Sequence, residues 1–317
     1  MATPRTPRPP WPRPRTSSPA AGRRRTPEAA GVQTVLRSAS KEVVIGDDQP
    51  FCIIGERINP TGRKAFQAQL QAGDLSRLEV DVAQQVAGGA MVLDVNMGAP
   101  LADEVGLMAQ AVKLVQAMTD LPLCIDSSVI EALESGLSAY EGKALVNSVT
   151  AEDDRMAAIL PLVRDHGAAI IMLPNDEEEI PVDPRRRLEL VDKCVEVAHG
   201  SYAIPLEDIL IDPLAMPVGA DTSLVHKTLE TISLIRDKYG LNMTLGASNV
   251  SFGMPDRHTL GAAFLPMAMV AGLTSAIMDA RSPAIVRGVK AADLFLDHDP
   301  WGGAWIAAHR AAQAAAG

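Results

Sequence analysis

Short apolar runs alternate with longer segments of mixed apolar and polar residues from about residue 50 to about residue 280. The short runs are typical of buried strands, because turn residues bound them. They occupy residues 51–54, 90–95, 121–125, 143–149, 168–173, 208–211, 243–247 and 274–278. The longer segments predict helices of three or four turns, and they occupy residues 74–87, 103–118, 129–139, 153–166, 184–199, 222–238 and 258–271.

This alternation predicts an α/β fold, namely a (β/α)8 TIM barrel that extends over residues 32–317. An open, doubly wound parallel sheet is the alternative for the same alternation. A dinucleotide-binding sheet of that kind carries a Gly-rich fingerprint after its first strand, and none follows the run at residues 51–54. The pattern therefore favours the closed barrel.

The N-terminal segment has a different composition. Residues 1–25 carry seven Arg and no acidic residue, and the first 27 residues hold eight of the 23 prolines. Such a sequence cannot bury a core, so we expect residues 1–31 to form a disordered tail. A targeting peptide is one alternative, although no apolar stretch follows the Arg run at 23–25, and a misassigned start codon is another.

Charge and composition exclude several classes of partner. The net charge is −10, and residues 26–317 hold 22 basic and 39 acidic side chains, which argues against a nucleic-acid partner. No apolar stretch reaches the length of a membrane span, so we expect no membrane association. Cys52, Cys124 and Cys194 lie too far apart in the sequence for a disulfide framework or a CxxC zinc site. We therefore expect a cytoplasmic protein without a bound metal.

Polar residues follow the predicted strands at the points where they end. In a barrel these points meet at one rim, where active sites lie. Any one such residue is commonly a helix cap or a turn residue, but many Asp and Asn at one rim predict a site that binds a neutral ring rich in donors and acceptors. A reduced pterin is such a ring. The residues are Glu56, Asn59, Asp94, Asn96, Asp126, Ser127, Asn147, Asn175, Asp212, Ser248, Asn249 and Asp279.

Six blocks of sequence, each at a predicted strand end, carry a resemblance to a known family. They are GERIN at 55–59, LDVN at 93–96, CIDSS at 124–128, VNSVTAE at 146–152, IDP at 211–213, and ASNVSFG at 247–253 with Arg257. Over residues 51–280 the chain resembles the methyltetrahydrofolate:corrinoid methyltransferases, which include the folate-binding module of cobalamin-dependent methionine synthase. It departs from them at Gly261–Ala262, where relatives often carry Asn, and at Phe252, where some carry Gln.

The resemblance implies a barrel of the pterin-binding type and a role for each matching residue. The implied reaction moves the N5-methyl group between methyltetrahydrofolate and the cobalt of a corrinoid (cobalamin), in either direction. The corrinoid is expected on a separate corrinoid-binding protein, and this chain is expected to form a homodimer. Asp126, Asn147 and Asp212 would hold the pterin ring, with Asp94, Asn96, Arg257 and Glu56 around it and Asn249 as the catalytic residue beside the methyl group.

The chemistry of methyl transfer explains why a donor is needed beside N5. Displacement would expel a nitrogen anion unless N5 gains a proton or a strong hydrogen bond as the carbon–nitrogen bond breaks. Asn249 can donate such a bond, and a carboxylic acid of raised pKa is the alternative. Two other functions stay open at this point. They are a dihydropteroate synthase-like condensing enzyme and a non-catalytic folate-binding subunit.

Overall fold

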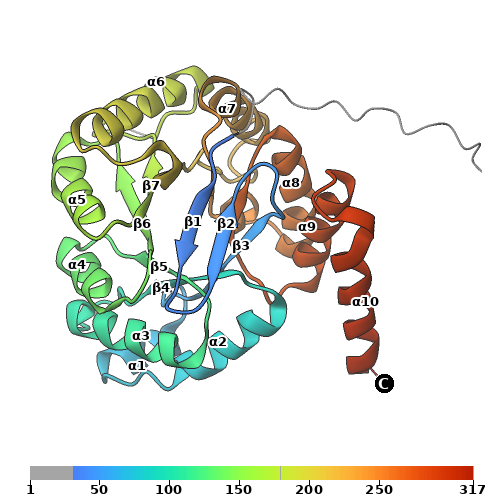
Figure 1. Cartoon of the computed structure of the whole chain (residues 1–317), viewed down its shortest axis with the longest axis horizontal. Coiled ribbons are helices and arrows are strands. Elements are labelled where there is room, and N and C mark those ends of the chain that lie inside the picture. The colour runs from blue at the N-terminus through green and yellow to red at the C-terminus, as the bar shows by residue number, and fades with distance from the viewer. Residues whose placement is uncertain (1–30, 179, 317) are drawn as a thin grey trace, which may run out of the picture. The chain divides into compact units, whose positions relative to one another are not determined.

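Seven parallel strands form a curled sheet at the centre of the protein, with helices around it (Figure 1). The structure is a computed structural model, and it describes residues 31–178 and 180–316. The expected tail therefore lies, but for residue 31, outside the described residues. The strands, in the order in which they pair, are β8 (Ile209–Ile211), β7 (Ala169–Leu173), β6 (Leu145–Thr150), β5 (Leu123–Asp126), β4 (Val92–Asn96), β3 (Cys52–Ile58) and β9 (Ser275–Met278).

The segment predicted as a further strand, residues 243–247, closes the barrel between β8 and β9 without forming a regular strand. The Thr244 N–H donates to the Ile211 carbonyl at 3.1 Å, and the Ser275 N–H donates to the Met243 carbonyl at 3.0 Å. The Met243 N–H donates to the Thr274 hydroxyl at 3.0 Å instead of to a backbone oxygen. The barrel fold is thus confirmed, while the prediction of a regular eighth strand was wrong, because a side chain replaces part of the backbone pairing.

Helices cover the outside of the barrel where the pattern predicted them. They are α2 (Arg77–Gly88), α3 (Glu104–Met118), α4 (Ile130–Ala139), α5 (Asp153–Asp165), α6 (Pro184–Val195), α7 (Leu224–Tyr239) and α8 (Arg257–Ala271). The segment predicted as one helix at 184–199 ends in a π-helical turn at Glu196–Ser201. The pattern missed α1 (Lys64–Gln71), α9 (Pro283–Phe295) and α10 (Gly303–Ala316). In residues 31–178 and 180–316, no helix combines the length and hydrophobicity needed to cross a membrane.

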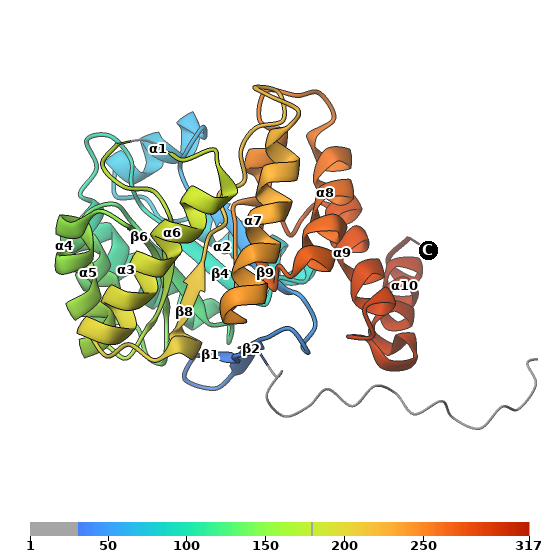
Figure 2. The ribbon, with the colours of Figure 1, turned by 90° about the horizontal axis from the view of Figure 1, so that it is seen from above.

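An antiparallel hairpin, β1 (Thr34–Arg37) with β2 (Glu42–Ile45), covers the amino-terminal ends of the barrel strands. Figure 2 shows this hairpin at one end of the barrel and α1 at the other. Leu36, Val43 and Ile45 are buried against residues near the starts of six strands, among them Cys52 and Val92. The sequence pattern did not predict the hairpin. It gives the barrel a closed, apolar floor.

The side chains inside the barrel change from apolar to polar along five of the strands. Alternate residues of a strand point to the same side, so each pair two residues apart places one side chain above the other. The lower member of each pair is packed in the apolar floor, and the upper member is polar. The pairs are Ile54 and Glu56, Val92 and Asp94, Cys124 and Asp126, Leu145 and Asn147, and Leu210 and Asp212. We call the carboxyl-terminal opening that holds these polar residues the barrel mouth.

Candidate active site

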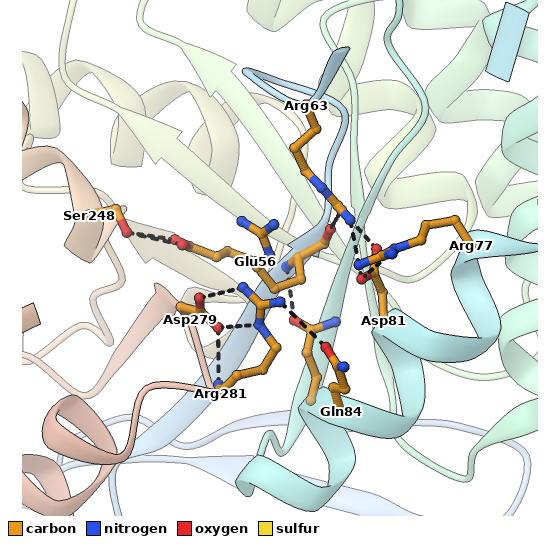
Figure 3. A network of polar contacts seen from close by, with 10 residues as sticks. Glu56, Arg63, Arg77, Asp81, Gln84, Ser248, Asp279 and Arg281 are labelled. Carbon is orange, nitrogen blue, oxygen red and sulfur yellow. Dashed lines mark hydrogen bonds and ion pairs between the residues drawn. The ribbon is translucent and has the colours of Figure 1, made fainter. Parts of the chain in front are cut away.

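Glu56 reaches the barrel mouth from a bulge in β3. The register of β3 against β4 shifts between Gly55 and Ile58, and the Arg57 N–H donates to the side-chain oxygen of Gln85 on α2 at 2.8 Å. A larger residue at Gly55 would displace the Gln85 side chain, because a Cβ atom would lie 2.4 Å from that same oxygen. Figure 3 shows Glu56 pointing towards Ser248, whose hydroxyl donates to both carboxylate oxygens at 3.0 Å. Burial raises the pKa of Glu56 despite this hydrogen bond.

Asp94 and Asp126 form a pair of neighbouring carboxyl groups on β4 and β5. Burial, and then the charge of Asp126, raise the pKa of Asp94 well above its usual range. Burial also raises the pKa of Asp126, to about 6, although hydrogen bonds with Asn96 and Asp94 lower it. The Asn147 amide donates to Asp94 at 3.1 Å. Burial and the mutual charge of the two groups thus both favour the retention of a proton by this pair of carboxyl groups.

Asp212 directly follows β8. In the sheet order, β7 and β6 separate β8 from β5, which carries Asp126. Its carboxylate accepts a hydrogen bond from the Leu214 N–H at 2.8 Å. Burial raises its pKa to about 7, against that bond and the charge of Arg187. A ligand that donates two hydrogen bonds to this half-buried carboxylate would therefore stabilise its ionised form.

Arg187 holds the loop that carries Asp212, and the sequence analysis did not identify it. The side chain lies on α6 and is fully buried. It donates to the carbonyl oxygens of Pro181, Pro213 and Leu214 at 2.7, 2.8 and 3.0 Å. Its guanidinium fork thus fixes the carbonyl groups of the two residues that follow Asp212.

Asn249 lies in a short 3-10 helix, Ala247–Ser251, directly above the irregular closing segment. The residue is exposed, and within the described residues its amide makes no side-chain hydrogen bond. Arg257, at the start of α8, donates to the Ser248 carbonyl at 2.6 Å and to the Ser251 hydroxyl at 3.3 Å. Arg257 therefore supports the turn that presents Asn249, and its own exposed guanidinium lies beside the mouth.

Three further polar residues belong to the mouth. Asn59 donates to Asp126 at 3.5 Å, which adds a third amide to those of Asn96 and Asn147. Asp279, after β9, pairs with Arg281 at 2.7 Å; burial raises its pKa, but the bonds to Arg281 outweigh burial and lower it (Figure 3). Asn59 and Asp279 were visible as strand-end residues, whereas Arg281 gave no signal beyond its nearness to Asp279.

The eight predicted site residues thus lie on the carboxyl-terminal side of the barrel strands, and hydrogen bonds join most of them into two groups. One group combines Asp94, Asp126, Asn96 and Asn147, and the other combines Glu56 and Arg257 through Ser248. Asp212 and Asn249 stand apart from both groups. In the part of the chain that the structure describes, no three His, Cys, Asp or Glu side chains are grouped so that they could hold a metal ion.

Comparisons with known proteins identify a family and several relatives. Residues 55–279 match the family model described as pterin binding enzyme. A protein named methylcorrinoid:tetrahydrofolate methyltransferase, from Eubacterium limosum, is 30% identical over 253 residues, which cover 78% of this chain and 92% of that protein. A methionine synthase from Mycobacterium tuberculosis is 31% identical over 251 residues, which cover 75% of this chain. The chain spans about a fifth of the length of the methionine synthases that it matches.

Solved structures share the fold. A dihydropteroate synthase from Xanthomonas albilineans, solved with 4-aminobenzoic acid, superposes with a TM-score of 0.62 at 19% identity and covers 83% of this chain and 98% of that chain. A 7,8-dihydropteroate synthase from Vibrio fischeri gives a TM-score of 0.63 at 16% identity, with coverage of 84% and 99%. At this level of identity the likeness concerns the barrel and not its chemistry.

Proposed function

The chain belongs to the pterin-binding enzyme family, and from this premise we propose that it moves the N5-methyl group between methyltetrahydrofolate and the cobalt of a corrinoid on a separate protein. The observation that carries the proposal is the layer of carboxyl and amide groups in the barrel mouth, above an apolar floor. The name of the Eubacterium limosum relative, which aligns over nearly its whole length, supports the same reaction class.

The carboxyl groups of the mouth bind the pterin ring in this proposal. The 2-amino group and the neighbouring ring N–H donate two parallel hydrogen bonds to one carboxylate, and we assign this role to Asp212, with Asp126 as the second acceptor. Asp94 and the amides of Asn96 and Asn147 serve the 4-oxo group and the remaining ring nitrogens. Burial removes water from Asp212 and Asp126 and raises their pKa. The N–H groups of the ring replace this water, so ring binding lowers the pKa of both carboxyl groups again.

Asn249 acts at N5. Its exposed amide donates a hydrogen bond to N5 that strengthens as the carbon–nitrogen bond breaks and the electron pair moves to nitrogen. The corrinoid, when its cobalt is reduced, supplies the nucleophile for the methyl carbon. Arg257 holds the turn that carries Asn249 through its bonds to Ser248 and Ser251. A donor that acts mainly in the transition state raises the rate more than the affinity.

The partner in this proposal is a corrinoid-binding protein that approaches the open mouth. The exposed side chains of Phe252 and Met254, next to the turn of Asn249, lie where such a protein would approach. The homodimer that the resemblance implies stays a prediction, which the molar mass in solution tests.

Methyl transfer from methyltetrahydrofolate to free, reduced cobalamin tests the proposal. We expect the cobalamin absorbance to change at a rate proportional to enzyme concentration, and methylcobalamin with tetrahydrofolate to give the reverse reaction. Calorimetry with methyltetrahydrofolate alone forms the second arm. Binding without transfer, both to free cobalamin and with a corrinoid protein, would favour a folate-binding subunit, and formation of dihydropteroate would favour a condensing enzyme.

A further inference from the structure

A cavity of about 320 Å³ lies at the carboxyl-terminal part of β3. Its lining contains four cationic side chains, contributed by the end of β3, the start of α1 and the start of α2. They are Arg57, Arg63, Lys64 and Arg77, together with the ring of Phe66 and the amide of Gln69. Such a concentration of positive charge is unusual in a chain whose net charge is −10.

The charges of this basic pocket are only partly balanced. Asp81 on α2, which is fully buried, pairs with Arg63 at 2.7 Å and with Arg77 at 3.2 Å (Figure 3). Within residues 31–178 and 180–316, Arg57 and Lys64 make no ion pair. The Arg57 Nε atom is buried without a hydrogen-bond partner. Burial, and then the charges of Arg281 and Arg63, lower the pKa of Arg57. An anion in the pocket would relieve this repulsion.

The first turn of α1 adds backbone donors to the same pocket. Arg63 is the N-cap residue of α1, and no side chain caps this helix end. Lys64, Ala65 and Phe66, which form the first turn, all line the cavity. N–H groups at a helix start have no acceptor within the helix, and the helix dipole adds positive potential there. Together with the four cations, they complete a site for negatively charged oxygens.

The basic pocket and the barrel mouth meet at β3. Glu56 points into the mouth and bonds Ser248, while the next residue, Arg57, lines the pocket. Glu56 and Arg57 are consecutive in β3, so one side chain of the mouth and one side chain of the pocket come from neighbouring residues. The charge of Arg57 also acts on Glu56 and lowers its pKa.

We propose that the basic pocket binds the carboxylates of the glutamate tail of tetrahydrofolate, an inference that rests on the proposed function. The tail leaves the pterin ring through an aminobenzoyl spacer and ends in γ-linked glutamates, each of which adds one carboxylate. Several cations spread along one cavity suit such a chain of carboxylates. Arg57 and Lys64, which have no carboxylate partner in the described residues, supply the unbalanced charges.

Calorimetry with methyltetrahydrofolate carrying one or three glutamates tests this proposal on the full chain. We expect the triglutamate to bind about tenfold more tightly than the monoglutamate at low salt, and the difference to shrink at high salt. Lys64→Gln should reduce this preference about threefold, because the triglutamate loses more charge contacts than the monoglutamate, and Arg57→Gln should act in the same direction. Lys113→Gln is the matched control, because Lys113 lines a different cavity, next to the hairpin residues 38–40.

Each outcome separates this inference from the proposed function. Monoglutamate binding with no gain from added glutamates, or an equal loss for both ligands in Lys64→Gln, would overturn the tail site and leave the proposed function standing. No binding of either form would overturn the proposed function itself. Inorganic phosphate is the probe for a general anion site. If phosphate weakens the binding of the monoglutamate and the triglutamate equally, the pocket does not distinguish the length of the glutamate tail, and the proposal is wrong.

Discussion

Replacing Asp212 with Asn should stabilise the ligand-free protein, and the gain should grow as the pH rises. Burial raises the pKa of Asp212 from its usual value of 3.8 to about 7. Between these two values the folded protein keeps a proton that the unfolded chain has released. The free energy of unfolding of the wild type therefore falls as the pH rises through this window and is constant above it. An amide side chain never ionises and avoids this loss.

The magnitude follows from the size of the shift. A difference of about 3 pKa units corresponds to about 4 kcal/mol. Asp212 keeps part of its surface exposed at the mouth, so we expect about half of that. The gain should be about 2 kcal/mol at about pH 8 and less than about 1 kcal/mol at about pH 5. The amide oxygen of Asn can still accept the bond from Leu214, so the loop should keep its position.

Urea unfolding followed by circular dichroism at the two pH values measures this gain. Asp221→Asn is the control, because Asp221 is exposed and its hydrogen bond from the Ser223 backbone lowers its pKa. That control should show no gain that grows with pH. The reasoning fails if the difference in free energy of unfolding between Asp212→Asn and the wild type is the same at both pH values. It also fails if the variant is less stable than the wild type at about pH 8, since ionisation of Asp212 would then not destabilise the folded state.

Other variants and conditions test the site directly. Asp126→Ala and Asp212→Ala should each weaken methyltetrahydrofolate binding by about 2–3 kcal/mol in calorimetry, because ring donors left unpaired in a buried pocket keep their desolvation cost; unchanged affinity in both would place the ring elsewhere. Affinity should rise as the pH increases from about 5.5 to about 7.5, because the ring donors bind the ionised form of Asp212, whose pKa is about 7; a flat profile would contradict this. Asn249→Ala should lower kcat about 100-fold, or about 2.7 kcal/mol, with a smaller effect on tetrahydrofolate binding; a change in KM alone would make Asn249 a binding contact. Arg187→Lys should lower the free energy of unfolding by about 2 kcal/mol in urea, because an ammonium group cannot reach all three carbonyl groups; wild-type stability would mean that the fork is dispensable.

The barrel was predictable because its strands and helices have different apolar periods. The limit of this pattern appears at residues 243–247, where the run is as apolar as the others but the Thr274 hydroxyl takes the place of a backbone acceptor. An apolar run indicates that a segment is buried, but it does not indicate which acceptor each backbone N–H group of that segment finds. The hairpin β1–β2 was missed because its strands have only four residues each, too few to show a clear alternation.

The site residues were predictable where they follow a strand, because parallel strands end at one rim. Arg187 shows what this reasoning misses. It is the last of three consecutive Arg residues, which together are typical of an exposed helix face. Only its spacing to Leu190, Val191 and Cys194 marks it as part of the buried face of α6. The basic pocket was missed although Arg57, Arg63 and Lys64 are close in the sequence, because Arg77 joins them only when α2 packs beside β3.

The hairpin that closes the floor of the barrel has a kinetic consequence. The Asn242 side chain ties it in place by donating to Val32, Thr34 and Ile45, so the polar layer is open at one end only. In the proposed reaction the folate and the corrinoid protein then share a single entrance, and the folate must enter first and leave last. Steady-state rates should follow an ordered sequential scheme, and an excess of corrinoid protein should inhibit turnover by occupying the empty enzyme in a dead-end complex.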